Sequence, residues 1–193
     1  MIAKIRFIIF ITMTLTGACA NMPPLMLDKT ALQDVDFCLN LDGLEFEHQL
    51  IFIHHAKLAA KLATQSIKAI TGKGSIDIVA SGCRNFVYIS DKPNVDYKGR
   101  AHRFTKTRFN QTRLSRVNIE ITVQAYMSFF EDVGEEPFGL TVLLMHEFGH
   151  ALGLDHVEDD FEDVMYVGYN SFQRLEYKQI KFMDIYVDYG IKK

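Results

Sequence analysis

The stretch HEFGHALGLDH, residues 146–156, decides how the rest of the chain is interpreted. His146 and His150 are four residues apart, so on a helix they lie on one face, a single turn apart. That spacing allows two imidazole nitrogens to reach one metal ion at roughly 2.0–2.1 Å. Gly153 supplies the positive φ that a sharp turn after the helix needs, and His156 follows as a third ligand.

Glu147 directly follows the first histidine, where it can hydrogen-bond a water on the metal without being a ligand itself. Three neutral histidines leave one coordination position open, which is typical of catalytic zinc sites. The competing interpretation is an amphipathic helix that happens to carry histidines. Residues 138–154 are apolar nearly all round, however, and burying Glu147 unpaired among them would be costly. The sequence therefore predicts one catalytic Zn²⁺, with Glu147 as general base.

Length and composition place the chain in a broad class. It has 193 residues, of which 48% are hydrophobic and 23% are charged, as expected for one globular domain. The formal net charge of −3 gives no basic excess, which argues against nucleic acid as a partner. We expect a monomer whose partner is a protein or peptide substrate.

The first twenty residues have the pattern of a signal peptide. A basic start is followed by the apolar run FIIFITMTLT, which is too short to span a bilayer. Ala18-Cys19-Ala20 fits ordinary cleavage, whereas LTGAC, residues 15–19, resembles a lipobox in which Cys19 is lipidated. Both alternatives predict export, either to a bacterial cell envelope by a lipid anchor or to the periplasm or medium. A membrane is expected as a partner only through that anchor.

Two cysteines remain if Cys19 is lipidated or removed. Cys38 and Cys83 can then pair, since exported proteins meet an oxidising compartment. The alternative is two unpaired thiols, one of them buried as a small apolar residue.

Periodicity predicts an α+β domain at residues 46–193, preceded by a tether and entry segment at residues 21–45. Apolar positions at helical spacing predict a long helix over residues 47–71, ended by Gly72. Short β-branched and aromatic runs predict about four strands, at residues 75–81, 85–90, 99–109 and 116–123. The buried helix at residues 138–154 follows, and then a closing helix around residues 171–188.

The zinc-binding stretch resembles the signature of the metzincin metallopeptidases, and most closely the matrixin type, H-E-[FL]-G-H-[AS]-L-G-L-x-H. Metzincins have a methionine-containing turn beneath the metal, and the resemblance assigns that role to Met165. Matrixins typically continue Met-Tyr-Pro-x-Tyr, and here valine replaces the proline. The resemblance implies a metzincin-like catalytic domain with a twisted mixed sheet. It also implies that the outer wall of the S1′ pocket consists of Tyr166, Val167, Gly168 and Tyr169.

The expected function is that of an exported zinc-dependent endopeptidase. Its substrate would extend along an exposed strand edge, for which residues 101–105 are the best candidate. Two alternatives stay open, an exported zinc-binding protein without turnover and a zinc hydrolase of non-peptide amides.

Acidic residues gather between His156 and Met165. The simplest interpretation is a solvated charged loop. The functional alternatives are a Ca²⁺ site, because hard cations take several carboxylates, or a bias toward basic substrates. The residues concerned are Glu158, Asp159, Asp160, Glu162 and Asp163.

Overall fold

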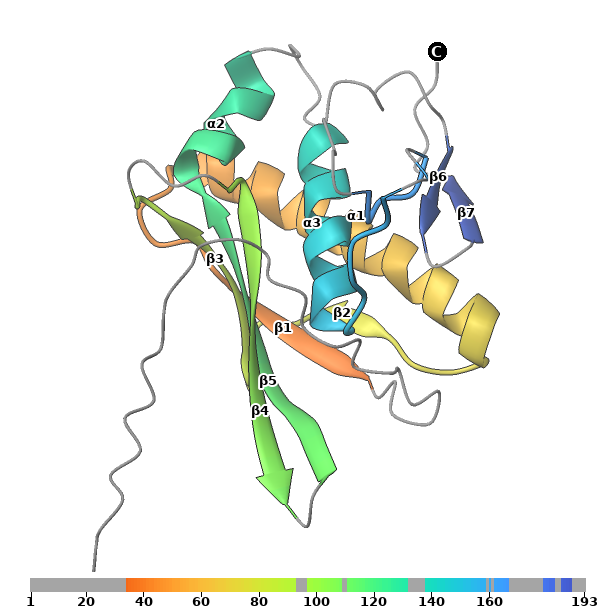
Figure 1. Cartoon of the computed structure of the whole chain (residues 1–193). Helices are drawn as coiled ribbons and strands as arrows, with labels where there is room; N and C mark the ends of the chain where they lie inside the picture. Colours follow the sequence, from red (N-terminus) through yellow and green to blue (C-terminus); the bar gives the residue numbers. More distant parts are fainter. Residues whose placement is uncertain are drawn as a thin grey trace, which may run out of the picture.

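The structure is a computed structural model of the whole chain. It describes residues 34–92, 97–108, 111–131, 138–158, 160, 162–166, 179–182 and 185–188. In chain order the elements are β1 (Val35–Asn40), α1 (Phe46–Thr71), β2 (Ile76–Ile78), β3 (Asn85–Ser90), β4 (Gly99–Arg108), β5 (Gln111–Thr122), α2 (Val123–Glu131), α3 (Phe138–Ala151), β6 (Gln179–Phe182) and β7 (Ile185–Asp188). This arrangement confirms the predicted α+β class (Figure 1).

Five strands form one mixed sheet in the order β2-β1-β3-β5-β4. Strands β2, β1, β3 and β5 run parallel to one another, whereas β4 is antiparallel to β5 and lies at the edge. The four expected strands are present, with β5 longer at its start than the alternation indicated. Strand β1 is additional and lies within residues 21–45, where a tether and entry segment was expected. Its sequence, VDFCLN, has three successive apolar residues and so does not alternate strictly, and periodicity did not identify it.

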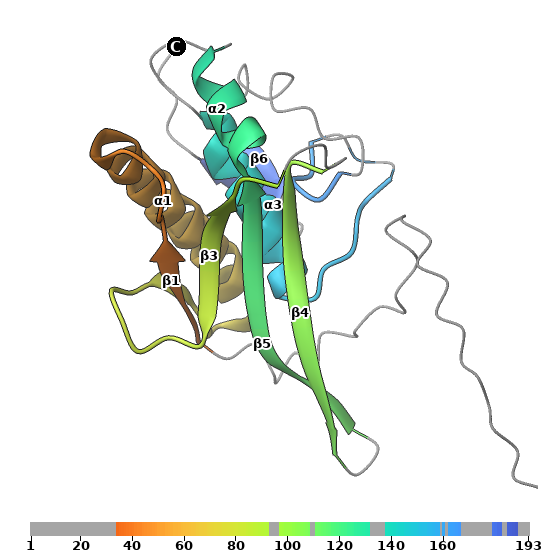
Figure 2. The same cartoon turned by 90° about the vertical axis from the view of Figure 1, so that its left-hand side faces the viewer.

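The helices α1 and α3 cover one face of this sheet, and Figure 2 shows the strands in front of them. Phe37 of β1 and Phe148 of α3 are both fully buried, with ring centroids 5.2 Å apart. Phe52 of α1 and Ile119 of β5 belong to the same core. Because α3 is packed on several sides, its apolar character all round is explained, and its position relative to β4 and β5 is fixed.

The ends of two helices follow local signals. Gly72 ends α1 as predicted, with φ of 73° and its N–H donated to the carbonyl of Lys68. The short helix α2 was not predicted, because the alternation over residues 116–123 indicated a strand and no helix was expected before residue 138. Thr122 Oγ1 accepts the N–H of Ala125 at 3.1 Å, so this threonine acts as the N-cap of α2.

The closing helix predicted over residues 171–188 is wrong where the structure describes that segment. Strands β6 and β7 pair there as an antiparallel two-stranded sheet. Strand β6 is also tied to the chain near Met165, since Val164 N–H donates to Lys181 O and Lys181 N–H donates to Glu162 O. These long-range backbone hydrogen bonds outweigh the helical spacing of the apolar residues.

Cys38 of β1 and Cys83, just before β3, are joined as a disulfide, with Cα atoms 5.8 Å apart. This is the pair expected from the sequence. Because Phe37 points into the core, Cys38 faces the opposite side of the sheet. Within the part of the chain that the structure describes, no helix is both long and apolar enough to cross a membrane.

Candidate metal centre

The helix α3 ends in a turn that brings the chain back toward its own histidines. Gly153 has φ of 93° and donates its N–H to His150 O, while Leu154 N–H donates to Gly149 O. These two bonds form a Schellman motif with glycine at the left-handed position. The motif satisfies carbonyls at the end of the helix and reverses the chain so that His156 can return.

The three histidines predicted as ligands converge on one point. Nε2 of His150 lies 3.1 Å from Nε2 of His146 and 3.1 Å from Nε2 of His156, and the third distance is 3.3 Å. Ligands 2.0–2.1 Å from a tetrahedral zinc ion would be about 3.3–3.4 Å apart. The spacing of the nitrogens therefore fits zinc.

Two backbone carbonyls determine which ring nitrogen carries the proton. His146 Nδ1 lies 2.7 Å from Val164 O, and His150 Nδ1 lies 2.9 Å from Leu154 O. A carbonyl only accepts, so each Nδ1 is the donor and each Nε2 presents a lone pair to the common point. Burial lowers the pKa of His150, which favours the neutral, ligating ring. Lone pairs this close repel one another unless a cation lies between them.

Glu147 is 3% exposed, and its position also favours a polar ligand at the site. Ala101 N–H of β4 donates to its carboxylate. Its Oε2 atom is buried without a hydrogen-bond partner within the described part of the chain. Burial raises the pKa of Glu147 to about 8, against which the Ala101 hydrogen bond and the charge of Arg100 act. A cation at the histidines would likewise favour the carboxylate form.

Met165, to which the resemblance assigns the methionine turn, packs against Gly149 of α3. It is 2% exposed, and its carbonyl accepts the N–H of Val157 at 2.9 Å. A Cβ added at Gly149 would lie 2.3 Å from Met165 Sδ, so only glycine permits this approach. Sequence reasoning missed Gly149, although it occupies a fixed position of the quoted motif. Since Val164 holds His146, the turn also orients a ligand.

The edge strand β4 runs beside this site. A Cβ added at Gly99 would lie 2.7 Å from Glu147 Oε1, so the start of β4 is in contact with the predicted general base. The expectation that residues 101–105 form a sheet edge is confirmed among the described strands. Substrate pairing along that edge stays a prediction.

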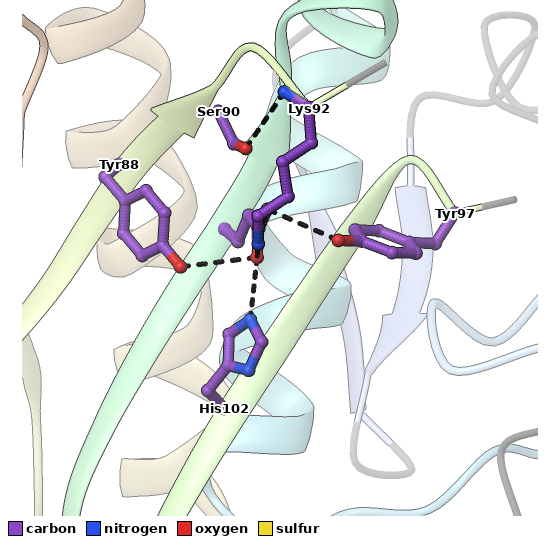
Figure 3. Close-up of polar contacts among 6 residues, drawn as sticks. Tyr88, Ser90, Lys92, Tyr97 and His102 are labelled. Carbon is purple, nitrogen blue, oxygen red and sulfur yellow. Dashed lines mark hydrogen bonds and ion pairs between the residues drawn. The ribbon is translucent and has the colours of Figure 1, made fainter. Parts of the chain in front are cut away.

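On the face of the sheet away from α3, a second polar cluster surrounds Glu120 of β5 (Figure 3). The side chain of Glu120 is fully buried, yet it lies 2.9 Å from Lys92 Nζ and 2.8 Å from His102 Nε2. The hydroxyls of Tyr88 and Tyr97 each donate to it at 3.3 Å.

Burial alone would raise the pKa of the Glu120 carboxyl. Hydrogen bonds from Lys92, His102 and Ser90 outweigh this effect and hold that pKa at about 2. The cluster joins β3, β4 and β5 through a charged group whose oxygens are already paired. No local sequence motif predicts this cluster, because its members are spread over residues 88–120, in β3, β4, β5 and the positions just after β3 and just before β4.

Several predicted site residues cannot be placed. Cys19 and the expected S1′ wall residues Val167, Gly168 and Tyr169 lie outside the described residues. Tyr166 is half-buried and donates its N–H to Asp163 O at 3.1 Å.

The acidic loop after His156 is partly described. Asp160 forms an ion pair with Lys181 at 2.6 Å, and Asp163 Oδ1 accepts the N–H of Met165 at 2.7 Å. These two carboxylates stabilise the turn that carries Met165. The calcium site stays a prediction.

The family model of the matrixins matches residues 63–187, well over half of the chain. The match includes α3, all three histidines and Met165. No curated protein matches the chain. With the convergent histidines and the buried glutamate, this match shows that the chain belongs to the matrixin family of zinc metallopeptidases.

Proposed function

We propose that the protein is an exported zinc-dependent endopeptidase in which Glu147 acts as the general base. The observation that carries the proposal is the convergence of three Nε2 lone pairs, 3.1–3.3 Å apart, beside a buried carboxylate with an unpaired oxygen. A site that only stored zinc would have no need for Glu147 there.

Zinc, when bound by His146, His150 and His156, would supply the positive charge that polarises a scissile carbonyl and acidifies a nearby water. Glu147 accepts a proton from that water as its oxygen attacks the carbonyl carbon. The carboxyl then passes the proton to the departing amine as the carbon–nitrogen bond breaks. Ala101 N–H holds the carboxylate in place for both transfers.

The substrate is proposed to bind as an extended strand along β4. In an antiparallel pair, alternate residues direct both backbone groups away from the neighbouring strand. Lys98 O accepts the N–H of Thr122 on β5, whereas Ala101 N–H points to Glu147. Alternate residues from Gly99 onward therefore offer backbone groups to an added strand, except Ala101 N–H, which Glu147 accepts.

The test is cleavage of a diverse peptide library by the purified zinc-loaded protein, read by mass spectrometry. Glu147→Gln keeps the size of the side chain and removes the base, so it is expected to retain one zinc per chain and lose cleavage. Cleavage that persists in Glu147→Gln or in a chelator would overturn the mechanism. Bound zinc without any cleavage would favour a binding role or a non-peptide amide substrate.

Export is proposed from the sequence of residues 1–20, which lie outside the described residues. The mass of the mature protein separates the two forms of export, since a lipid-anchored chain begins at a modified Cys19. A Cys19→Ala variant is expected to lose that added mass and leave the membrane fraction. A mature chain that retains Met1 would refute export by this leader.

A further inference from the structure

Positive charge is concentrated on the two strands next to the metal centre. Between Tyr97 and Ile119 the sequence has seven lysines and arginines and no aspartate or glutamate, although the whole chain has a net charge of −3. This segment contains β4 and most of β5, the hairpin that extends beyond the rest of the sheet (Figure 2). The acidic residues 158–163 lie on the other side of His156 in the sequence.

Arg103 is the member of this basic segment that faces the metal centre. Side chains alternate along β4, and Gly99 and Ala101 lie on the α3 side, in contact with Glu147 and the core. Arg103, two residues beyond Ala101, shares that face, and it is half-buried. Its positive charge acts on the ligand His150, whose pKa is lowered first by burial and then also by the charges of His156 and Arg103.

The backbone N–H and C=O groups of Arg103 point toward the open edge of β4, as those of Ala101 do, because backbone orientation alternates along an antiparallel strand. The register pairs Ala101 with Ile119 and Arg103 with Val117, so these alternate residues have equivalent orientations before the irregularity at Phe104/Thr105. A peptide that adds to β4 would therefore pass directly across Arg103. Its side chains on the α3 side would lie about 4.5–5.5 Å from those of β4.

Two other arginines of this hairpin, Arg100 and Arg116, stack on aromatic rings. Arg100 lies over the ring of Tyr97, and Arg116 lies 4.1 Å from the ring centroid of Phe104. His102 lies on the opposite face, bound to Glu120. The charge of Arg100 also reaches Glu147, but its side chain alternates to the face of His102. Arg103 differs from Arg100 in lying on the α3 face of β4, with its charge acting on His150.

We propose that the enzyme selects substrates with an acidic side chain close to the scissile bond, and that Arg103 binds this carboxylate. The inference rests on the proposed function and names its substrate class. A planar guanidinium pairs with a carboxylate through two parallel hydrogen bonds, which gives both charge and geometric selection.

The experiment compares matched peptides that share one cleaved sequence and carry Glu, Gln or Lys at single positions around the scissile bond. We expect kcat/KM for Glu over Gln to be about tenfold at one or two positions on one side of the bond, the size of a charge-assisted hydrogen bond. Arg103→Gln should bring this ratio to one. Arg103→Glu should favour the Lys peptide instead.

Two control variants separate this contact from general charge. Lys57→Gln removes an exposed cation on α1, and Lys106→Gln removes an exposed cation farther along β4. Both are expected to keep the Glu preference. Arg103→Lys preserves the charge and should retain part of the preference for the Glu peptide. Its behaviour shows whether the lost preference in Arg103→Gln reflects misfolding. A wild-type ratio of one at every position, or a ratio that survives Arg103→Gln, would overturn the proposal.

A binding measurement keeps this inference separate from the proposed function. Zinc-loaded Glu147→Gln is titrated with the fluorescent Glu and Gln peptides, and anisotropy is recorded. The Glu peptide should bind about tenfold more tightly, and adding Arg103→Gln should remove the difference. If the wild-type protein cleaves nothing, the proposed function fails, and equal binding of the two peptides would then reject the acidic preference as well.

Discussion

Two polar clusters lie on opposite faces of the same sheet, and they differ in what completes them. On the α3 face, three histidine lone pairs meet beside Glu147, whose Oε2 is buried without a partner among the described residues. On the other face, Glu120 receives the ammonium of Lys92, the ring N–H of His102 and two tyrosine hydroxyls. The first cluster contains only electron-rich groups, whereas the second already contains its cation.

The difference teaches how to distinguish a ligand site from a structural network. Buried hydrogen-bond acceptors that face one another repel each other unless a cation binds between them. The stability of such a cluster therefore depends on binding the cation. A buried carboxylate surrounded by donors is stable by itself and holds neighbouring strands together. Metal removal should therefore affect the first cluster strongly and the second hardly at all.

The largest effect is expected from His150→Ala. This change removes one of three ligands, and the variant should lose both its bound zinc after dialysis and its peptide cleavage. Metal content per chain and turnover are the measurements. His54→Ala, on the exposed side of α1, is the control and should keep both. A His150→Ala protein that still holds one tightly bound zinc would show that the cluster is not the metal site.

Removing the disulfide tests a covalent connection on the Glu120 face. Cys38→Ala with Cys83→Ala should lower the free energy of unfolding by about 2–4 kcal/mol, because the unfolded chain gains entropy. Urea unfolding measures the loss, and zinc content should stay unchanged. Two free thiols in the unreduced wild-type protein would contradict the pairing.

Glu120→Gln removes the negative charge at the centre of the second cluster. We expect the free energy of unfolding to fall by about 2–3 kcal/mol, since the replacement loses charge-assisted hydrogen bonds. Zinc should still bind at one per chain. Glu47→Gln, at an exposed position of α1, is the matched control and should change little. If Glu120→Gln abolishes zinc binding while the protein stays folded, the two faces are not independent.

The same residue predicts an acid dependence. The pKa of Glu120 is held at about 2 in the folded protein, below its ordinary value of 4.5. Its contribution to stability is therefore complete above pH 4.5 and is lost as pH falls toward 2. We therefore expect acid to destabilise the zinc-free wild-type protein through Glu120, and this contribution should be absent from the zinc-free Glu120→Gln variant. Identical acid profiles for the two proteins would rule it out.

Gly149→Ala tests the contact that supports the metal centre from below. The added methyl would collide with buried Met165, so the free energy of unfolding should fall by about 1–3 kcal/mol. Because Val164 orients His146, zinc affinity should also weaken, by roughly tenfold. Competition with a zinc chelator measures the affinity. Gly82→Ala, at a loop glycine with open space around its Cβ position, is the control for zinc affinity, which it should leave unchanged.

The convergence of the three histidines was predictable from the sequence because its geometry is local. Two ligands lie one helical turn apart, Gly153 reverses the chain, and the third ligand follows within a few residues. The helix spacing of residues 47–71 and the alternation in β3 and β4 likewise predicted those elements nearly to their ends. In each case, neighbours in sequence decide the structure.

Other features depended on which distant residues meet. Glu120 reads as one polar position in an alternating strand, and only the pairing of β3, β5 and β4 surrounds it with donors. Backbone bonds between β6 and the chain near Val164 turned an expected helix into strands. Arg103 became a candidate specificity residue because register places it on the α3 face. Register and long-range hydrogen bonding are set by tertiary packing, whose energy local periodicity does not contain.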